Sequence, residues 1–282
     1  MPEKMKISAV ICELNPLHLG HRHLLDRARE RSDAVVCILS GNFVQRGEPA
    51  VLDKWARTRL ALENGADLVL ELPLPWACAG AERFAAGGVH LANALGAVDF
   101  LVFGSEEPDL ARLSSAADAL LSPEFSQELS RQEDGGATFA RRREAALSRL
   151  LGPEHAAVLR SPNCILGIEY LKALRRENSS ILPVAVPRVG AGHDETGGNG
   201  PFRSAGELRE LFWSGGDFTP FVPESTAAHV RELSAAARCP ARIHHLERAI
   251  LCKLRSMSPA ELAALPDLSE GLENRLAQAI RQ

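Results

Sequence analysis

Two histidines on either side of a glycine-containing turn are the first residues whose spacing could do chemistry. The segment ELNPLHLGH, residues 13–21, follows a short apolar run and precedes a helix-like stretch. Backbone N–H groups at the start of a helix attract phosphate, and a glycine lets the backbone come close to it. Imidazoles placed there can donate to a triphosphate while pyrophosphate leaves. His18 and His21 therefore predict nucleotidyl transfer by positioning and electrostatics, without a covalent nucleophile.

Two other interpretations of these histidines stay open. His18, His21 and His23 could bind a metal, but zinc needs a further ligand and no cysteine lies at a usable spacing. The rings could also be ordinary surface or capping residues. Their place between a strand and a helix favours the nucleotide interpretation.

The elements that would position the histidines alternate between short apolar runs and longer helical segments. Strands are expected near 6–13, 34–40, 67–71, 98–103 and 181–187, with helices near 20–31, 50–64, 77–95 and 164–177. Continuous apolar strands are typical of a parallel sheet that is covered on both faces. The pattern predicts an α/β fold with a Rossmann-like parallel sheet, whose chemistry lies at the carboxyl ends of the strands.

Interruptions of this pattern indicate the domain organisation. A helical insertion is expected at about 108–177, broken by the polar residues EDGG at 133–136. After residue 215 a turn-rich segment leads into helices near 226–238, 243–257 and 270–281, with no further strands. We therefore expect a catalytic domain over residues 1–215 and a helical C-terminal part over residues 216–282.

Polar residues also follow the other predicted strands. Gln45 and Arg46 could hold a small carboxylate or a phosphate, although a turn with a surface arginine explains them equally well. Gly104 follows the fourth strand, where a glycine lets a ligand approach the backbone. A serine that starts a helix, with an arginine one turn later, offers a second helix terminus to phosphate. The remaining candidates, each of which could also be a cap or a solvated side chain, are Asn163, Arg188 and Ser204.

Composition narrows the class of protein. The 282 residues are 45% hydrophobic and 24% charged, which is globular usage and excludes collagen-like and disordered chains. The longest apolar runs are strand-sized, too short for a membrane span, and the first residues lack a signal-peptide cleavage site. Six cysteines without a C-x-x-C pair fit a reducing compartment. We expect a cytoplasmic protein.

Charge is unevenly distributed, although the net charge is only −4. Residues 1–140 hold 13 Lys/Arg and 20 Asp/Glu, whereas residues 141–188 hold nine Lys/Arg and four Glu. This basic segment could contact the phosphates of a nucleic acid. A solvated helix face is an equally good interpretation. The residues expected to contact RNA are Arg141, Arg142, Arg143, Arg175 and Arg176.

Taken together, the motifs resemble a known family. The H-x-G-H turn and the later S-x-x-x-x-R helix start resemble the HxGH nucleotidylyltransferase superfamily. Within it, the chain is similar to the tRNA(Met) cytidine acetate ligase family in the segments ELNPLHLGH, SGNFVQRGEPAVLDKWAR, GADLVLELP, AERFA, FGSEE, SPNCILGIEYL, PRVGAGHD, SAGELR and EGLENRL. These segments run in one consistent order from about residue 6 to the end of the chain.

The resemblance implies a two-step reaction. ATP activates acetate to acetyl-adenylate and pyrophosphate, and the acetyl group passes to N4 of the wobble cytidine in elongator tRNA(Met). His18 and His21 are the implied catalytic residues. Acetate and the tRNA are the implied partners, and Mg²⁺ is expected to accompany the triphosphate, although no protein ligand can be assigned to it. The implied ATP contacts are Ile11, Glu13, Asn15, Pro16, His18, Gly20, His21, Leu24, Gly104, Asn163, Arg188 and Ser204.

The chain departs from the family pattern in places. Leu14, Leu17 and Leu19 stand where the family usually has Tyr, Phe and Asn, and Gly80 replaces a Ser. Family members usually continue past the EGLENRL-like segment, so we expect a C-terminal part that is truncated relative to the family. Two alternative functions remain: adenylation of another small acid or phosphorylated metabolite, and a non-catalytic RNA-binding module. ATP turnover with a series of acids discriminates between them.

Overall fold

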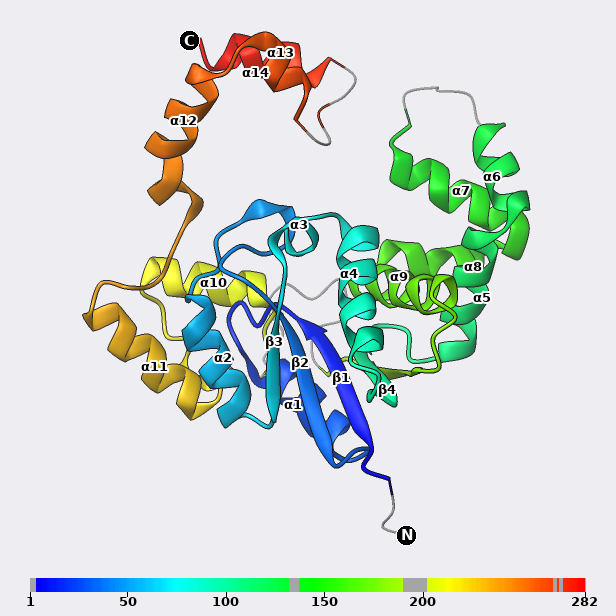
Figure 1. The fold of residues 1–282 in the computed structure, drawn as a ribbon, viewed down its shortest axis with the longest axis horizontal. Helices are drawn as coiled ribbons and strands as arrows, with labels where there is room; N and C mark the ends of the chain where they lie inside the picture. The colour runs from blue at the N-terminus through cyan, green and yellow to red at the C-terminus, as the bar shows by residue number, and fades with distance from the viewer. Residues whose placement is uncertain (1–3, 132–136, 190–201, 266–267, 269–270, 282) are drawn as a thin grey trace. The chain divides into compact units, whose positions relative to one another are not determined.

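Five parallel strands form the centre of the computed structural model, which describes residues 4–131, 137–189, 202–265, 268 and 271–281. The strands are β1 (Ile7–Cys12), β2 (Ala34–Ser40), β3 (Leu68–Leu72), β4 (Phe100–Ser105) and β5 (Leu182–Pro187). Their order across the sheet is β3-β2-β1-β4-β5, and all neighbouring pairs are parallel (Figure 1). Strand order reverses between β1 and β4, which is where ligands of such sheets bind. The predicted Rossmann-like sheet is confirmed.

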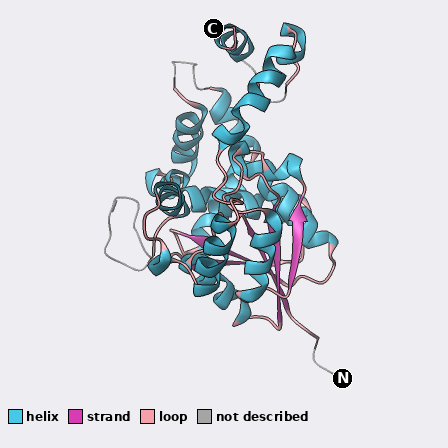
Figure 2. Ribbon diagram, turned by 90° about the vertical axis from the view of Figure 1, so that its left-hand side faces the viewer, coloured by secondary structure: helices cyan, strands magenta, loops and turns pink. Residues whose placement is uncertain are grey.

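Alternate residues of β1 enter two cores, one on each face of the sheet. Ala9 and Ile11 belong to the first core, and Val10 and Cys12 belong to the second. Successive side chains of a strand point to opposite faces, so a strand covered on both sides must be apolar throughout. Figure 2 shows the strands surrounded by helices. The helices that contribute to the first core include α4 (Ala81–Ala94), α5 (Leu110–Leu121) and α9 (Pro162–Arg176), and those of the second include α1 (Leu19–Arg29) and α2 (Lys54–Glu63).

Helices fill the stretch between β4 and β5, where the insertion is expected. Besides α5 and α9 they are α6 (Pro123–Ser130), α7 (Phe139–Leu151) and α8 (Pro153–Ala156). The EDGG residues at 133–136 lie outside the described residues. The last of these helices, α9, packs against both α4 and β4. Its first turn, which contains Asn163, therefore lies near the carboxyl end of β4.

The chain divides into two compact units, Met1–Pro240 and Ala241–Gln282. The first extends past residue 216, because Phe212, Val230 and Leu233 pack in the second core. The division into domains at residue 216 stays a prediction. Within the described residues, no helix has the length and apolarity needed to cross a membrane. The remaining helices are α3 (Leu74–Ala77), α10 (Ala205–Ser214) and α11 (Glu224–Ala235) in the first unit, and α12 (Glu247–Ser256), α13 (Pro259–Ala263) and α14 (Leu272–Ala279) in the second.

Candidate active site

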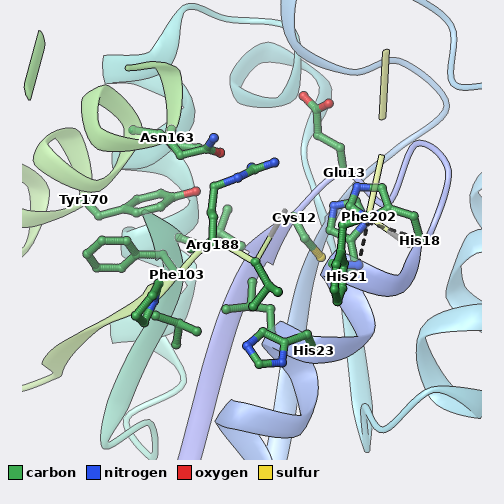
Figure 3. Close-up of a pocket in the computed structure, with 18 of the residues that line it drawn as sticks. Cys12, Glu13, His18, His21, His23, Phe103, Asn163, Tyr170, Arg188 and Phe202 are labelled. Atoms are coloured by element: carbon green, nitrogen blue, oxygen red, sulfur yellow. Dashed lines mark hydrogen bonds between the residues drawn. The ribbon is translucent and has the colours of Figure 1, made fainter. Parts of the chain in front are cut away.

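A cavity of about 250 Å³ lies at the carboxyl ends of β1, β4 and β5 (Figure 3). Its walls come from the end of β1, the β1–α1 turn, α9 and the residues that follow β5. This is the place where a sheet of this topology binds its ligand. Nine of the predicted ATP contacts line the cavity: Ile11, Glu13, His18, Gly20, His21, Leu24, Gly104, Asn163 and Arg188.

The two histidines of the turn form a capping box at the start of α1. Nδ1 of His18 accepts a hydrogen bond from the N–H of Gly20 at 3.0 Å, and Nδ1 of His21 accepts one from the N–H of His18 at 3.4 Å. A Cβ on Gly20 would lie 2.9 Å from Cε1 of His18, so any other residue here would displace the His18 ring. With Nδ1 as acceptor, a neutral His18 carries its ring proton on Nε2. The residue caps the helix with one nitrogen and can donate to a ligand with the other.

Both imidazoles are neutral at pH 7. Burial lowers the pKa of His18 well below its ordinary value, and His21 and Arg188 lower it further. Burial and the charge of Arg188 lower the pKa of His21 to about 4, against an opposing hydrogen bond with the backbone of Pro16. Arg188 lines the cavity and has no ion-pair partner among the described residues. Positive charge at this site therefore comes from a guanidinium rather than from the histidines, whose role as neutral donors to a ligand stays a prediction.

A buried arginine holds the strand ends around the cavity. Arg57 is fully buried and donates to the carbonyls of Glu13 at 2.6 Å and Leu52 at 3.1 Å, and also to that of Gly41. Burial raises the pKa of the Glu13 carboxyl, although its Oε1 accepts from the N–H of Gln45 at 2.9 Å. Arg57 is a positioning residue that sequence reasoning missed; the available signal was an arginine on the apolar face of α2.

The first turn of α9 forms the opposite rim of the cavity. Glu106 caps it, because its Oε1 accepts from Nδ2 of Asn163 at 2.5 Å and its Oε2 from the N–H of Cys164 at 3.1 Å. A Cβ on Gly104 would make ordinary contact with Cγ of Arg188, at 3.6 Å. Packing within the protein does not require this glycine. It is therefore consistent with backbone kept bare for a ligand.

Three predicted ATP contacts do not line the cavity. Asn15 and Pro16 belong to the β1–α1 turn, where Nη1 of Arg209 donates to the carbonyl of Asn15 at 3.0 Å. Ser204 caps α10, and its N–H and hydroxyl both donate to Oε2 of Glu207 at 2.8 Å. A carboxylate of the chain itself thus occupies the helix start expected to cradle phosphate. Contact of these three residues with ATP stays a prediction.

The arginines expected to contact RNA are largely engaged inside the protein. Three are held by carboxylates: Arg143 by Glu169, Arg175 by Asp118 and Arg176 by Glu82. Arg142 also has a partner. Arg141 is exposed and has no ion pair within the described part of the chain. Ion pairs within the protein thus neutralise much of the positive charge excess of residues 141–188. Contact of these arginines with RNA stays a prediction.

Sequence reasoning missed the apolar part of the cavity. Tyr170 is the only tyrosine of the chain, and it lies in α9 between Glu169 and Lys172, so the local sequence carried no signal that it lines a cavity. Among the described residues no group of three or more His, Cys, Asp or Glu could hold a metal ion, so the three-histidine metal interpretation gains no support. The lining residues without an assignment from sequence include Cys12, Phe84, Phe103, Leu166, Tyr170, Val186 and Phe202.

Comparisons with known proteins identify the family. The profile described as HIGH Nucleotidyl Transferase matches residues 5–282. The chain belongs to this family. Relatives from Acetivibrio thermocellus and Caldanaerobacter subterraneus, both named tRNA(Met) cytidine acetate ligase, are 39% and 40% identical over 98% of this chain and over 69% and 70% of their own.

A solved structure supports the same grouping for this HIGH nucleotidyl transferase. Thermotoga maritima TmcAL bound with alpha-thio ATP is 34% identical and matches with a TM-score of 0.90, over 99% of this chain and 68% of the other. The resemblance to the tRNA(Met) cytidine acetate ligases is thus confirmed along nearly the whole chain.

Proposed function

We propose that this HIGH nucleotidyl transferase is an ATP-dependent tRNA(Met) cytidine acetate ligase. It activates acetate as acetyl-adenylate and acetylates N4 of the wobble cytidine of elongator tRNA(Met), in the cytoplasm. The observation that carries the proposal is the neutral pair His18 and His21 beside Arg188, in a fold that matches a structure bound with an ATP analogue. The names of the relatives support acetate and tRNA(Met) as substrates.

The first step needs charge stabilisation rather than a general base. Acetate is ionised at pH 7, so its oxygen can attack the α-phosphorus directly. Negative charge moves onto pyrophosphate as the bond to the bridging oxygen breaks. His18 and Arg188 line the cavity in which that charge forms, and the start of α1 adds the positive end of a helix dipole. A Mg²⁺ ion that accompanies the triphosphate would take its ligands mainly from phosphate and water.

The second step is acylation of a neutral aromatic amine. N4 of the cytidine bonds to the acetyl carbon, the carbon–oxygen bond to phosphate breaks, AMP leaves with the electron pair, and N4 releases one proton to solvent. Because the adenylate is already activated, acetyl-CoA is not required as a donor. Product formed from acetyl-CoA without ATP would refute this.

One experiment tests the whole proposal. The protein is incubated with ATP, labelled acetate and tRNA(Met), and the nucleosides are analysed for N4-acetylcytidine; pyrophosphate exchange is measured separately without tRNA. We expect acetate-dependent exchange, and labelled N4-acetylcytidine only when all three substrates are present. Exchange that depends on another acid, or RNA binding without any ATP turnover, would overturn the proposal.

A further inference from the structure

The inner end of the cavity combines an apolar wall with one unsatisfied hydroxyl. Tyr170 is 1% exposed, and its hydroxyl has no hydrogen-bond partner among the described residues. Its ring centroid lies 5.6 Å from that of Phe103 (Figure 3). Ile11 and Phe84 are buried in the same core and line the same cavity. Because an unpaired buried hydroxyl is costly, a group that enters the cavity is the natural acceptor for it.

Two glycines hold this wall in place. A Cβ on Gly88 of α4 would lie 2.6 Å from Cδ1 of Ile11, and a Cβ on Gly167 of α9 would lie 2.6 Å from Cε2 of Phe103. Ile11 and Phe103 therefore pack directly against the backbone of α4 and α9 at these glycines. The two side chains have no space to retreat from the cavity, so its inner width is fixed.

We propose that Ile11, Phe84, Phe103 and Tyr170 form an acyl subsite, which holds the methyl group of acetate while the Tyr170 hydroxyl donates to one carboxylate oxygen. This inference rests on the proposed function and names the residues that select the acid. The other carboxylate oxygen bonds to the α-phosphorus, the bond to the bridging oxygen breaks, and pyrophosphate leaves with the electron pair.

The tyrosine keeps its proton during this step. Burial raises the pKa of Tyr170 well above its ordinary value, and Cys12 and Glu13 raise it further. The hydroxyl is therefore a neutral donor at pH 7.

A subsite of fixed width rejects longer acids. One methylene in an apolar pocket changes specificity by about 10- to 200-fold. Propionate would have to displace Ile11 or Phe103, which the two glycine contacts prevent. We therefore expect the wild-type protein to prefer acetate over propionate by at least about tenfold in kcat/KM, and to reject butyrate more strongly.

Pyrophosphate exchange with acetate, propionate and butyrate, in the absence of tRNA, tests the subsite. Tyr170→Phe removes only the hydroxyl, and should lower kcat/KM for acetate about 10- to 100-fold with the KM for ATP unchanged. Ile11→Val removes one methyl group from the wall, and should raise the propionate-to-acetate ratio about tenfold. Ile38→Val is the matched control, because Ile38 pairs with Ile11 in the sheet and shares its core but does not line the cavity.

The outcomes separate the subsite from the proposed function. Acetate-dependent exchange that Tyr170→Phe leaves intact, or an acid ratio that Ile11→Val leaves unchanged, overturns the subsite alone. A Tyr170→Phe protein that loses ATP affinity together with acetate assigns the hydroxyl to the nucleotide and also overturns it. A wild-type protein that exchanges with none of the acids overturns both proposals.

Discussion

The cavity and the arginine-rich helices of the insertion treat polar groups in opposite ways. In the cavity, Arg188 has no ion pair and the Tyr170 hydroxyl has no hydrogen bond within the described residues. In the insertion, Glu169 is almost fully buried between Arg143 and Lys172, so cation and carboxylate satisfy each other. The comparison teaches that a charge excess counted along the sequence need not be available to a ligand, because the fold can pair it internally.

Breaking the buried network should have the largest effect on stability. Nζ of Lys172 lies 2.7 Å from Oε2 of Glu169 and 3.3 Å from Oε1 of Glu82. Lys172→Met leaves the buried Glu169 short of a partner, and should lower the free energy of unfolding by about 3 kcal/mol, at the low end for a broken buried pair because Arg143 remains. Urea denaturation measures this.

The same variant shows whether the network is purely structural. Pyrophosphate exchange per folded molecule should stay at the wild-type level, because Lys172 and Glu169 do not line the cavity. Adding Glu169→Leu to Lys172→Met should recover part of the lost stability. Near-normal stability of the single variant would show that the insertion does not depend on its internal ion pairs. The contrast drawn above between the insertion and the cavity would then fail.

Removing a donor from the cavity should have the opposite result, with a large loss of exchange activity and little loss of stability. His18→Asn keeps a side chain suited to capping α1 but loses the ring donor, and His21→Ala removes the second ring. Each should cost about 2.7–4 kcal/mol of transition-state stabilisation, or 10²- to 10³-fold in exchange rate. For His18→Asn the loss of folding stability should stay below about 1 kcal/mol. His90→Asn is the control, since His90 is exposed, pairs with Glu177 and does not line the cavity. Near-normal exchange in both cavity variants would contradict the assignment.

The position of the cavity could be predicted because its signals are local. An apolar strand followed at once by the H-x-G-H turn and a helix fixes the place of His18 and His21 without knowledge of the rest of the fold. Gly104 lies at the end of β4 and Arg188 follows β5, and the carboxyl ends of these neighbouring strands must meet at one edge of a parallel sheet. The bounds of the strands and helices expected from the sequence agree closely with those in the structure, because they too depend on local sequence.

What could not be predicted depends on long-range pairing. The partner of Arg143 is Glu169, in a different helix, and the charge count alone cannot reveal this contact. Whether the Tyr170 hydroxyl finds a partner is likewise decided by the packing of α9 against the sheet. Ser204 is different, because SAGE is a capping-box sequence and already favoured Glu207 over phosphate as its partner.

A fall in pH should destabilise the protein at the histidine turn, with a smaller effect than the substitutions described above. The folded-state pKa of His21, about 4, lies below the ordinary histidine value of 6.5, so protonation favours the unfolded chain. This stability is complete above pH 6.5 and is lost as the pH falls towards 4. We expect the free energy of unfolding to drop by about 1–2 kcal/mol between pH 6.5 and 5, and by less in His21→Asn. Thermal unfolding at a series of pH values measures this. If the free energy of unfolding falls equally steeply with pH in the wild type and in His21→Asn, the turn does not hold its histidines neutral.

The smallest expected effect concerns the arginines, and it tests the comparison most directly. Arg141 is exposed without an ion pair in the described part of the chain, whereas Arg176 lies 2.7 Å from Glu82. If RNA passes over this segment, Arg141→Ala should weaken tRNA binding and flatten its salt slope by about 0.7–0.9. Arg176→Ala should change the slope less, because its charge is already balanced inside the protein. Exchange without tRNA should survive both substitutions, as neither residue lines the cavity.

Two outcomes would contradict this prediction. If Arg176→Ala flattens the salt dependence of tRNA binding as much as Arg141→Ala does, an ion pair within the protein does not prevent an arginine from contacting RNA. Unchanged slopes in both variants would show that the basic segment serves the fold alone.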